Sequence, residues 1–432
     1  MRSTLSTLIL ILLAAVFLAF AAVVGARSRD GIPSSLSRIM TSDAPPGVRF
    51  VSVALGGFRG LLADILWVRA ANLQEAGKFF EVAQLADWIT RLEPRYPEVW
   101  AYHAWNMSYN ITAVVSDPAD RWHWIKNGIR LLRDEGIPST PSSPSLYWEL
   151  GWTFYDKVGG RWDEATPFYR ISWAADITRL LGSGVPDYSE IERHEAVIQA
   201  LDSVGLKVDV MKSMENTYGP LDWRLPETHA LYWGYRGREF KSPDSVWCDR
   251  LVWMALTETV KDGTLLYEPN QRLYQRGPQL DVAAKGVRHC AIEKPSQAPL
   301  SSMAMVNFLR ESALTLYAFQ RPIEAEAALA ELKNMLGSMP ASMSLDKFVT
   351  EEIDERMKGM DLLGREKLIL NYLVRSDVWR RSGNPVFSGG YDRLAKRYWN
   401  AMGREGGDNA WQALQARAHE RALAENPIAV KP

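Results

Sequence analysis

The feature that most restricts the fold of this chain is a pair of helical patterns in residues 147–169. An aromatic residue, a Leu-Gly pair and a second aromatic residue stand at helical spacing, and after a turn an Ala and another aromatic residue follow: Tyr147, Leu150, Gly151, Phe154, Ala165 and Tyr169. Two antiparallel helices approach closely only where small residues lie at their crossing, and large aromatic side chains fill the space between neighbouring hairpins. One such hairpin cannot bury its apolar face alone, so several are expected to stack and share a core.

Other segments show parts of the same pattern, at residues 77–107, at residues 117–135 and, more weakly, at residues 309–336. The segment at 117–135 carries its own start signal. Asp117 can accept hydrogen bonds from the first backbone N–H groups of a helix, and Pro118 suits the first helical position because it lacks an N–H. These matches predict successive helical hairpins through the first half of the chain and one more near residue 325.

This arrangement resembles the tetratricopeptide repeat, a helical hairpin of about 34 residues. The resemblance implies a mainly α fold, a tetratricopeptide-like α-solenoid, in a membrane-anchored bacterial-type member of that superfamily. The unit at 147–169 departs from the family pattern in a slightly long turn and in lacking a closing Pro near Ile177. A chain of 432 residues is longer than one core usually covers. It is predicted to contain a transmembrane anchor or signal sequence at 1–27, a flexible linker at 28–50, a repeat array at 51–204, an irregular insertion at 205–300, and a helical hairpin with capping helices at 301–432.

The resemblance also implies a binding surface. In tetratricopeptide arrays the inner faces of the first helices line a groove that holds a partner peptide. The matching positions are strongly aromatic here, and they are Trp67, Gln74, Trp105, Tyr109, Trp148, Trp152 and Tyr155. The family's Lys, Asn and Arg set for a terminal carboxylate is not matched at these positions, so that specificity is not transferred. The alternative interpretation is that these aromatic residues pack against other parts of the chain, as buried Trp often does.

The amino terminus predicts membrane contact. Residues 8–24 contain no charged side chain, and with the residues before them they are long enough for a helix to cross a bilayer. A cleaved signal peptide is the alternative, because small residues at 24–26 could form a cleavage site, but the apolar run is longer than the usual signal core. Counting Arg residues would place the body in the cytoplasm. The short basic start before a long apolar run instead resembles an export signal, and we expect an extracytoplasmic, periplasmic-side body.

Residues 205–300 break the repeat pattern. Pro and Gly punctuate them, short helices are predicted at 227–235 and 245–260, and residues 264–274 resemble a small β-hairpin. The only two cysteines of the chain, Cys248 and Cys290, lie in this segment. In an exported domain they could form one disulfide; the alternative is two buried free thiols that behave as small apolar residues.

The composition limits the classes of function. The formal net charge is -1, with 50 basic and 51 acidic residues, whereas nucleic-acid binders carry a basic excess. The sequence has no zinc-ligand spacing, no phosphate-binding loop and no nucleophile motif, so we expect no metal, no cofactor and no catalytic residue. We therefore expect a membrane-anchored scaffold that binds a protein or peptide and assembles an envelope complex, with lipid contact through its first helix. The alternative function is a glycan-acting enzyme on an all-α scaffold, in which aromatic side chains bind sugar and two carboxylates catalyse hydrolysis.

Overall fold

The computed structural model describes residues 59–160, 162–182, 184–268, 273–293, 299–403 and 407–425. These residues form a mainly helical protein with one two-stranded hairpin, and they divide into a unit that ends at Val114 and a unit that begins at Val115. The predicted anchor at 1–27 and linker at 28–50 lie outside the described residues. Within the described ranges, every helix is too short or too polar to span a bilayer.

The first unit contains a helical hairpin followed by one long helix. Helix α4 (Arg59–Glu75) and helix α5 (Phe79–Leu92) are joined by a short turn in which Gly77 adopts a φ of 70°. The long helix consists of α6 (Pro97–Trp105), a π-helical segment at Asn106–Ile111 and α7 (Thr112–Val114). Leu66, Ile89 and Val99 pack together and join α4, α5 and α6 in one small core.

The second unit opens with the helix that the sequence predicts at 117–135. It consists of α8 (Pro118–Arg130), a π-helical segment at Leu131–Gly136 and α9 (Ile137–Ser139). The predicted cap is confirmed, because the Asp117 carboxylate accepts the N–H groups of Ala119 at 2.8 Å and Asp120 at 3.1 Å, and Pro118 occupies the first helical position. The hairpin at 147–169 follows as α10 (Pro144–Trp152), a π-helical segment at Thr153–Val158 and α11 (Thr166–Leu181).

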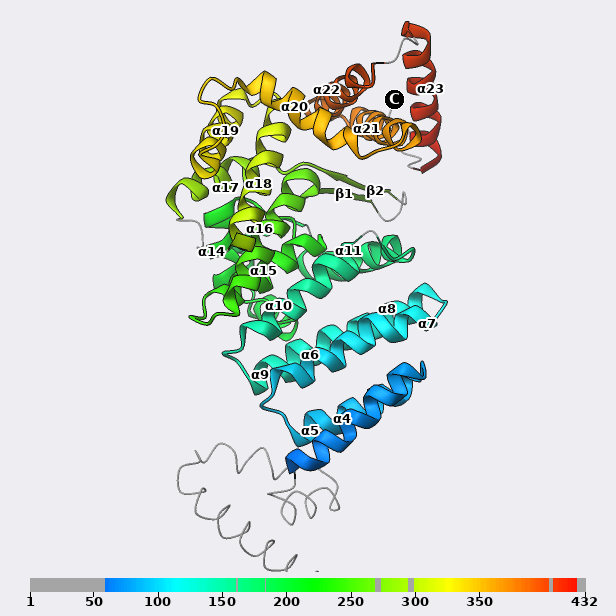
Figure 1. Cartoon of the computed structure of the whole chain (residues 1–432), viewed down its shortest axis with the longest axis vertical. Coiled ribbons are helices and arrows are strands. Elements are labelled where there is room, and N and C mark those ends of the chain that lie inside the picture. The colour runs from blue at the N-terminus through cyan, green and yellow to red at the C-terminus, as the bar shows by residue number, and fades with distance from the viewer. Residues whose placement is uncertain are drawn as a thin grey trace, which may run out of the picture. The chain divides into compact units, whose positions relative to one another are not determined.

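The centre of this unit is made by residues that the sequence interprets as an insertion. Helix α16 (Ser245–Asp262) packs against both α15 (Pro226–Arg238) and α18 (Pro299–Ala318), and α10 packs against α15 and α16 (Figure 1). Glycine permits this approach, since a Cβ atom at Gly151 would lie 2.7 Å from a methyl carbon of Leu251. Trp223, Trp253 and Phe308 are fully buried here. Helices α15 and α16, which fall within the predicted insertion at 205–300, therefore contribute to the core of the second unit.

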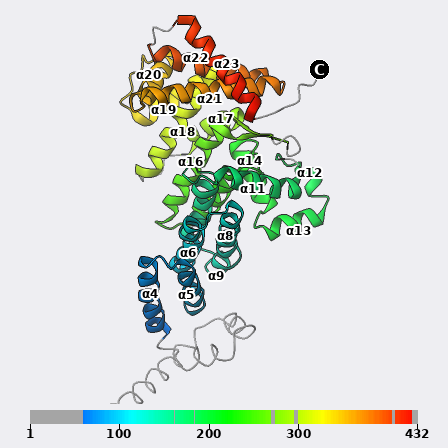
Figure 2. The same cartoon turned by 90° about the vertical axis from the view of Figure 1, so that its right-hand side faces the viewer.

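The remaining helices flank this centre. Figure 2 shows α12 (Tyr188–Ile191) and α13 (Glu195–Ser203) beside α11. The others are α14 (Val208–Tyr218), α17 (Leu280–Ile292), α19 (Pro322–Leu336), α20 (Leu345–Lys358), α21 (Leu362–Arg381), α22 (Pro385–Ala401) and α23 (Gly407–Glu425). Helix α21 packs against both α22 and α23, so the end of the chain forms a helical layer of its own.

A β-hairpin lies between α11 and the carboxyl-terminal helices. Strand β1 (Thr264–Glu268) pairs antiparallel with β2 (Leu273–Gly277) (Figure 1). Leu265 packs with Ala174 of α11, and the Trp379 indole N–H of α21 donates to the Arg276 carbonyl at 3.3 Å. A two-stranded hairpin is marginal in water, so these contacts on both sides are needed to hold it.

The two cysteines do not form the disulfide that the sequence allows. Both are buried free thiols. The Cys248 thiol donates to the Pro144 carbonyl at 3.3 Å and packs against Gly237, whereas Cys290 lies on α17. Burial raises the pKa of both thiols. The two side chains therefore act as small core residues, each packed among its own neighbours.

Buried ion pairs connect the hairpin to the helices around it. Arg276 of β2 contacts the Glu227 carboxylate of α15 at 2.7 Å, and its Nε donates to the Asp262 carbonyl at 3.2 Å. The Asp262 carboxylate in turn contacts Arg375 of α21 at 2.7 Å. Burial by itself would raise the pKa of Asp262, but the positive charges of Arg375 and Arg276 outweigh that effect and hold the pKa well below its usual range. These four side chains, of which Arg276, Glu227 and Asp262 are buried and Arg375 is half-buried, join β2, α15, α16 and α21.

We predict that Asp262→Asn will destabilise the second unit by about 3–5 kcal/mol, because it leaves the Arg375 guanidinium buried without its carboxylate. Urea unfolding of the full-length protein measures this. The matched control is Asp392→Asn, which removes an exposed carboxylate paired with Arg380 at 3.0 Å and is expected to cost at most about 1 kcal/mol. Equal losses in the two variants would contradict this role for Asp262.

The buried imidazole of His229 makes the free energy of unfolding depend on pH. Its ring is enclosed by Phe154, Trp173 and Trp223, and its Nε2 lies 2.7 Å from the Trp223 carbonyl. Burial lowers the pKa of His229 to about 4. The unfolded chain therefore binds a proton near pH 6.5 that the folded protein does not bind until about pH 4.

The stability contributed by neutral His229 is thus complete above pH 6.5 and falls as the pH approaches 4, by roughly 3 kcal/mol in total. We expect His229→Gln to flatten the slope of unfolding free energy against pH in this window. His123→Gln, at an exposed position, controls for the loss of an imidazole. If the His229→Gln slope equals that of the unsubstituted protein, the buried ring is not the group responsible.

Candidate functional site

The predicted groove residues of the first unit form two aromatic contacts. Trp67 of α4 packs edge-on against Tyr102 at a ring-centroid distance of 4.7 Å, and the Tyr102 hydroxyl donates to the Gln74 side-chain carbonyl at 2.6 Å. Trp105 stacks on Tyr109 at 5.9 Å. Gln74 is therefore engaged by a tyrosine that the sequence interpretation had not included.

The predicted groove residues of the second unit form a continuous row. Trp148 stacks on Trp152 at 5.6 Å, Trp152 contacts Tyr155 at 5.6 Å, and Trp247 of α16 contacts Trp148 at 6.3 Å. We call Trp247, Trp148, Trp152 and Tyr155 the aromatic row. Helical spacing places the three residues of α10 and its π-helical extension on one face, and the packing of α16 against α10 adds the fourth.

A groove continues from the aromatic row across α16 to α18. Its volume is about 280 Å³, and it is lined by Tyr155, Arg250, Met254, Thr257, Glu258, Leu300, Met303, Ala304 and Asn307. Met303 and Leu300 are 60% and 46% exposed, which is unusual for large apolar side chains. We call this surface, together with the aromatic row, the α10–α16–α18 groove.

Sequence reasoning missed the α16 and α18 side of this groove. Trp247, Arg250 and Met254 lie in the segment that the sequence predicts to be an insertion, outside the helices that resemble repeats. Their i, i+3, i+7 spacing was the available signal, because it places all three on one helical face. What the spacing could not show is that this face lies beside α10.

The charges in the α10–α16–α18 groove are few. The Arg250 guanidinium lies 5.9 Å from the Trp247 ring centroid, and no ion pair engages it within the part of the chain that the structure describes. Among the described residues that line the groove, Glu258 is the one carboxylate, and it pairs with Lys261. The groove thus presents one available cation beside an aromatic surface, and its lining does not supply the two carboxylates that glycoside hydrolysis requires.

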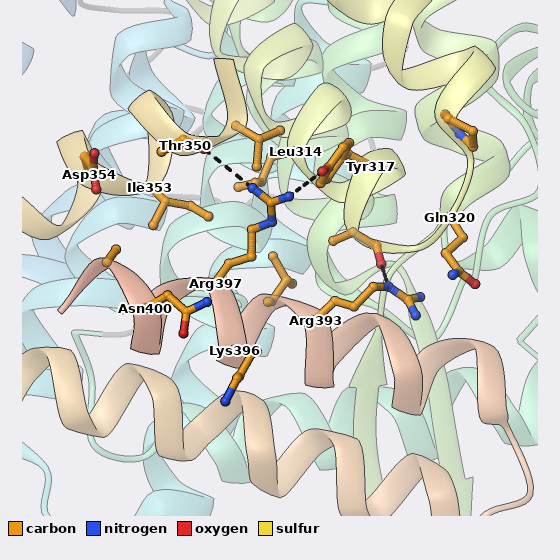
Figure 3. A pocket seen from close by; sticks show the side chains of 15 residues that line it. Leu314, Tyr317, Gln320, Thr350, Ile353, Asp354, Arg393, Lys396, Arg397 and Asn400 are labelled. Carbon is orange, nitrogen blue, oxygen red and sulfur yellow. Dashed lines mark hydrogen bonds between the residues drawn. The ribbon is translucent and has the colours of Figure 1, made fainter. Parts of the chain in front are cut away.

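A larger pocket lies at the other end of the second unit. It has a volume of about 990 Å³ and is formed by α18, α20 and α22 with the turn before α19 (Figure 3). The floor is apolar, with buried Leu314, Val349, Ile353 and Leu394. Three cationic side chains of α22 line the same pocket, and they are Arg393, Lys396 and Arg397. We call this the α18–α20–α22 pocket.

The three cations of this pocket differ in their partners. The Asp346 carboxylate accepts hydrogen bonds from the Tyr317 hydroxyl at 2.7 Å and from Arg397 at 2.6 Å, and these bonds lower the pKa of Asp346. Arg397 also donates to the Tyr317 hydroxyl. The Lys396 ammonium lies 4.8 Å from the Trp411 ring centroid. Arg393 donates from Nε to the Ala318 carbonyl at 2.6 Å, and its terminal nitrogens extend toward the side of the pocket where Gln320 lies (Figure 3).

Gln320 stands at the rim of this pocket in an unusual backbone conformation. Its φ is 61°, the one positive φ found among the non-glycine residues that the structure describes. The N–H of Arg321 donates to the Leu316 carbonyl at 2.8 Å, which is the hydrogen bond that closes a helix whose next residue is left-handed. Glycine usually occupies that position because it has no Cβ atom.

No protein-family model, no curated protein and no solved structure matches this chain. The function must therefore be argued from the two surfaces themselves.

We expect Gln320→Gly to stabilise the protein by about 1 kcal/mol, because it removes the steric cost of a left-handed conformation. Thermal unfolding measures this, and Gln320→Ala, which keeps the Cβ atom, should have little effect. If the glycine variant is less stable than the alanine variant, the left-handed conformation at Gln320 carries no steric cost.

Proposed function

We propose that this chain is a helical-repeat scaffold of the tetratricopeptide kind and that it binds an extended peptide segment of a partner protein in the α10–α16–α18 groove. The observation that carries this proposal is the half-exposed aromatic row beside Arg250, which forms no ion pair with any residue that the structure describes. Successive helical hairpins that place aromatic side chains on their first helices support the solenoid interpretation.

The spacing of the row suits an extended peptide. Alternate side chains of an extended chain repeat every ~6.6 Å on one face, and the ring centroids of the row follow one another at 5.6–6.3 Å. Aromatic side chains are the commonest anchors of binding energy at protein interfaces. We therefore propose apolar or aromatic side chains of the peptide against the row.

The charge of the groove defines the peptide further. Arg250 stacks beside Trp247 and has no carboxylate partner in the described ranges. The carboxylate of an acidic residue in the peptide would accept a charge-assisted hydrogen bond from the Arg250 guanidinium. The proposed occupant is thus an extended segment with an acidic residue next to apolar ones. The predicted anchor would hold such a scaffold at a membrane, with its body on the extracytoplasmic side, where it would assemble an envelope complex.

A random dodecapeptide library displayed on phage and selected against the full-length protein tests the proposal. We expect the selected peptides to combine an acidic residue with aromatic or aliphatic ones. In fluorescence anisotropy, Trp247→Ala should weaken their binding about tenfold or more. Arg250→Glu should weaken binding of acidic peptides and select basic ones instead.

The matched control is Trp162→Ala, which removes a Trp that is 92% exposed and lies outside the groove. It should leave peptide affinity unchanged. If the Trp162 and Trp247 variants lose affinity equally, or if the selected peptides carry no acidic bias, the peptide-binding proposal fails.

A further inference from the structure

We propose that the α18–α20–α22 pocket binds a single-chain amphiphile with an anionic head, a carboxylate or a phosphate monoester, whose chain lies on the apolar floor and whose head is held by Arg393. This proposal is independent of peptide binding, because the pocket and the α10–α16–α18 groove share no lining residue.

The first support is the shape and polarity of the pocket. Its volume of about 990 Å³ is at the upper end of the range for small-molecule sites. The floor consists of aliphatic side chains from three different helices, and they are Leu314, Ala318, Val349, Ile353 and Leu394. Contact between an acyl chain and this floor would remove apolar surface of both from water, which favours binding.

The second support is the distribution of charge. Of the four charged side chains that line the pocket, three are cationic and one, Asp354, is anionic. Arg397 is neutralised by Asp346, whereas Arg393 has no carboxylate at ion-pair distance within the described ranges. Partial burial lowers the pKa of Arg393. A partly buried guanidinium whose hydrogen-bond partner in the described ranges is a carbonyl has further donors that an anion would satisfy.

The third support is Gln320. The left-handed turn after α18 would be less strained with glycine, yet a long amide side chain stands there, at the pocket rim (Figure 3). Strained residues that the surrounding structure maintains are often those whose side chains act on a ligand. The Gln320 amide can donate a hydrogen bond to the same anionic head as Arg393, since both lie at the end of the pocket next to the turn before α19.

Isothermal titration calorimetry of the full-length protein tests the assignment, with ligands kept below their critical micelle concentrations. Dodecanoate and dodecyl phosphate should bind, and the tighter of the two identifies the preferred head. Dodecanol, which lacks the charge, and acetate, which lacks the chain, should bind at least about tenfold more weakly. If dodecanol binds as tightly as both anions, or acetate as tightly as dodecanoate, the proposal is overturned.

The variants locate the site. Arg393→Gln should weaken dodecanoate binding about tenfold or more and leave dodecanol binding unchanged. The matched control is Arg365→Gln, because Arg365 also donates from Nε to a backbone carbonyl, that of Met360, but lies outside the pocket. Equal effects of the two arginine substitutions would overturn the proposal.

Two further variants separate binding from folding. Gln320→Gly should weaken anion binding a few-fold while the unfolding temperature stays the same or rises, so the loss cannot come from unfolding. Ala401→Phe, at an exposed position of the lining, should block the chain and abolish binding of dodecanoate and dodecanol alike. If Ala401→Phe leaves binding intact in a folded protein, the amphiphile does not occupy this pocket.

Discussion

The buried guanidinium of Arg276 is the interaction on which the second unit depends. It joins a two-stranded hairpin to α15 through Glu227 and to α16 through the Asp262 carbonyl. The Asp262 carboxylate contacts Arg375 of α21. A hairpin of this length is marginal alone. Removing one partner of a buried pair leaves a charge without compensation, so the loss of any one of these side chains is expected to destabilise the packing of the four elements.

That arrangement determines where both surfaces form. Helix α16, which the hairpin contacts, packs against both α10 and α18, so Trp247 of α16 contacts Trp148 of α10. On the other side, α21 packs against α22, which presents Arg393 and Lys396 to the pocket closed by α18 and α20. One polar network in the core thus orients two surfaces that share no residue.

Local signals in the sequence indicated local structure well. Asp117 and Pro118 indicate the start of α8. The Leu-Gly pair at 150–151 indicates a close helix crossing, but the residue nearest to Gly151 across that crossing is Leu251 of α16 and not a residue of the predicted hairpin. The sequence did not show that helices within 205–300 lie in the core of the second unit, for a physical reason. Pro and Gly punctuation reports turns between helices, not whether those helices lie at the periphery or in the core.

The sequence by itself determined that the chain is mainly helical, that a helix begins at the Asp117 cap, and that Trp148, Trp152 and Tyr155 share a helical face. These properties depend on neighbours within one or two turns. Only the tertiary structure decided that Trp247 completes the row, that Cys248 and Cys290 remain apart, and that Arg393 faces an apolar pocket. Those outcomes depend on contacts between distant segments, which follow from the packing of whole helices and from buried ion pairs that no local pattern records.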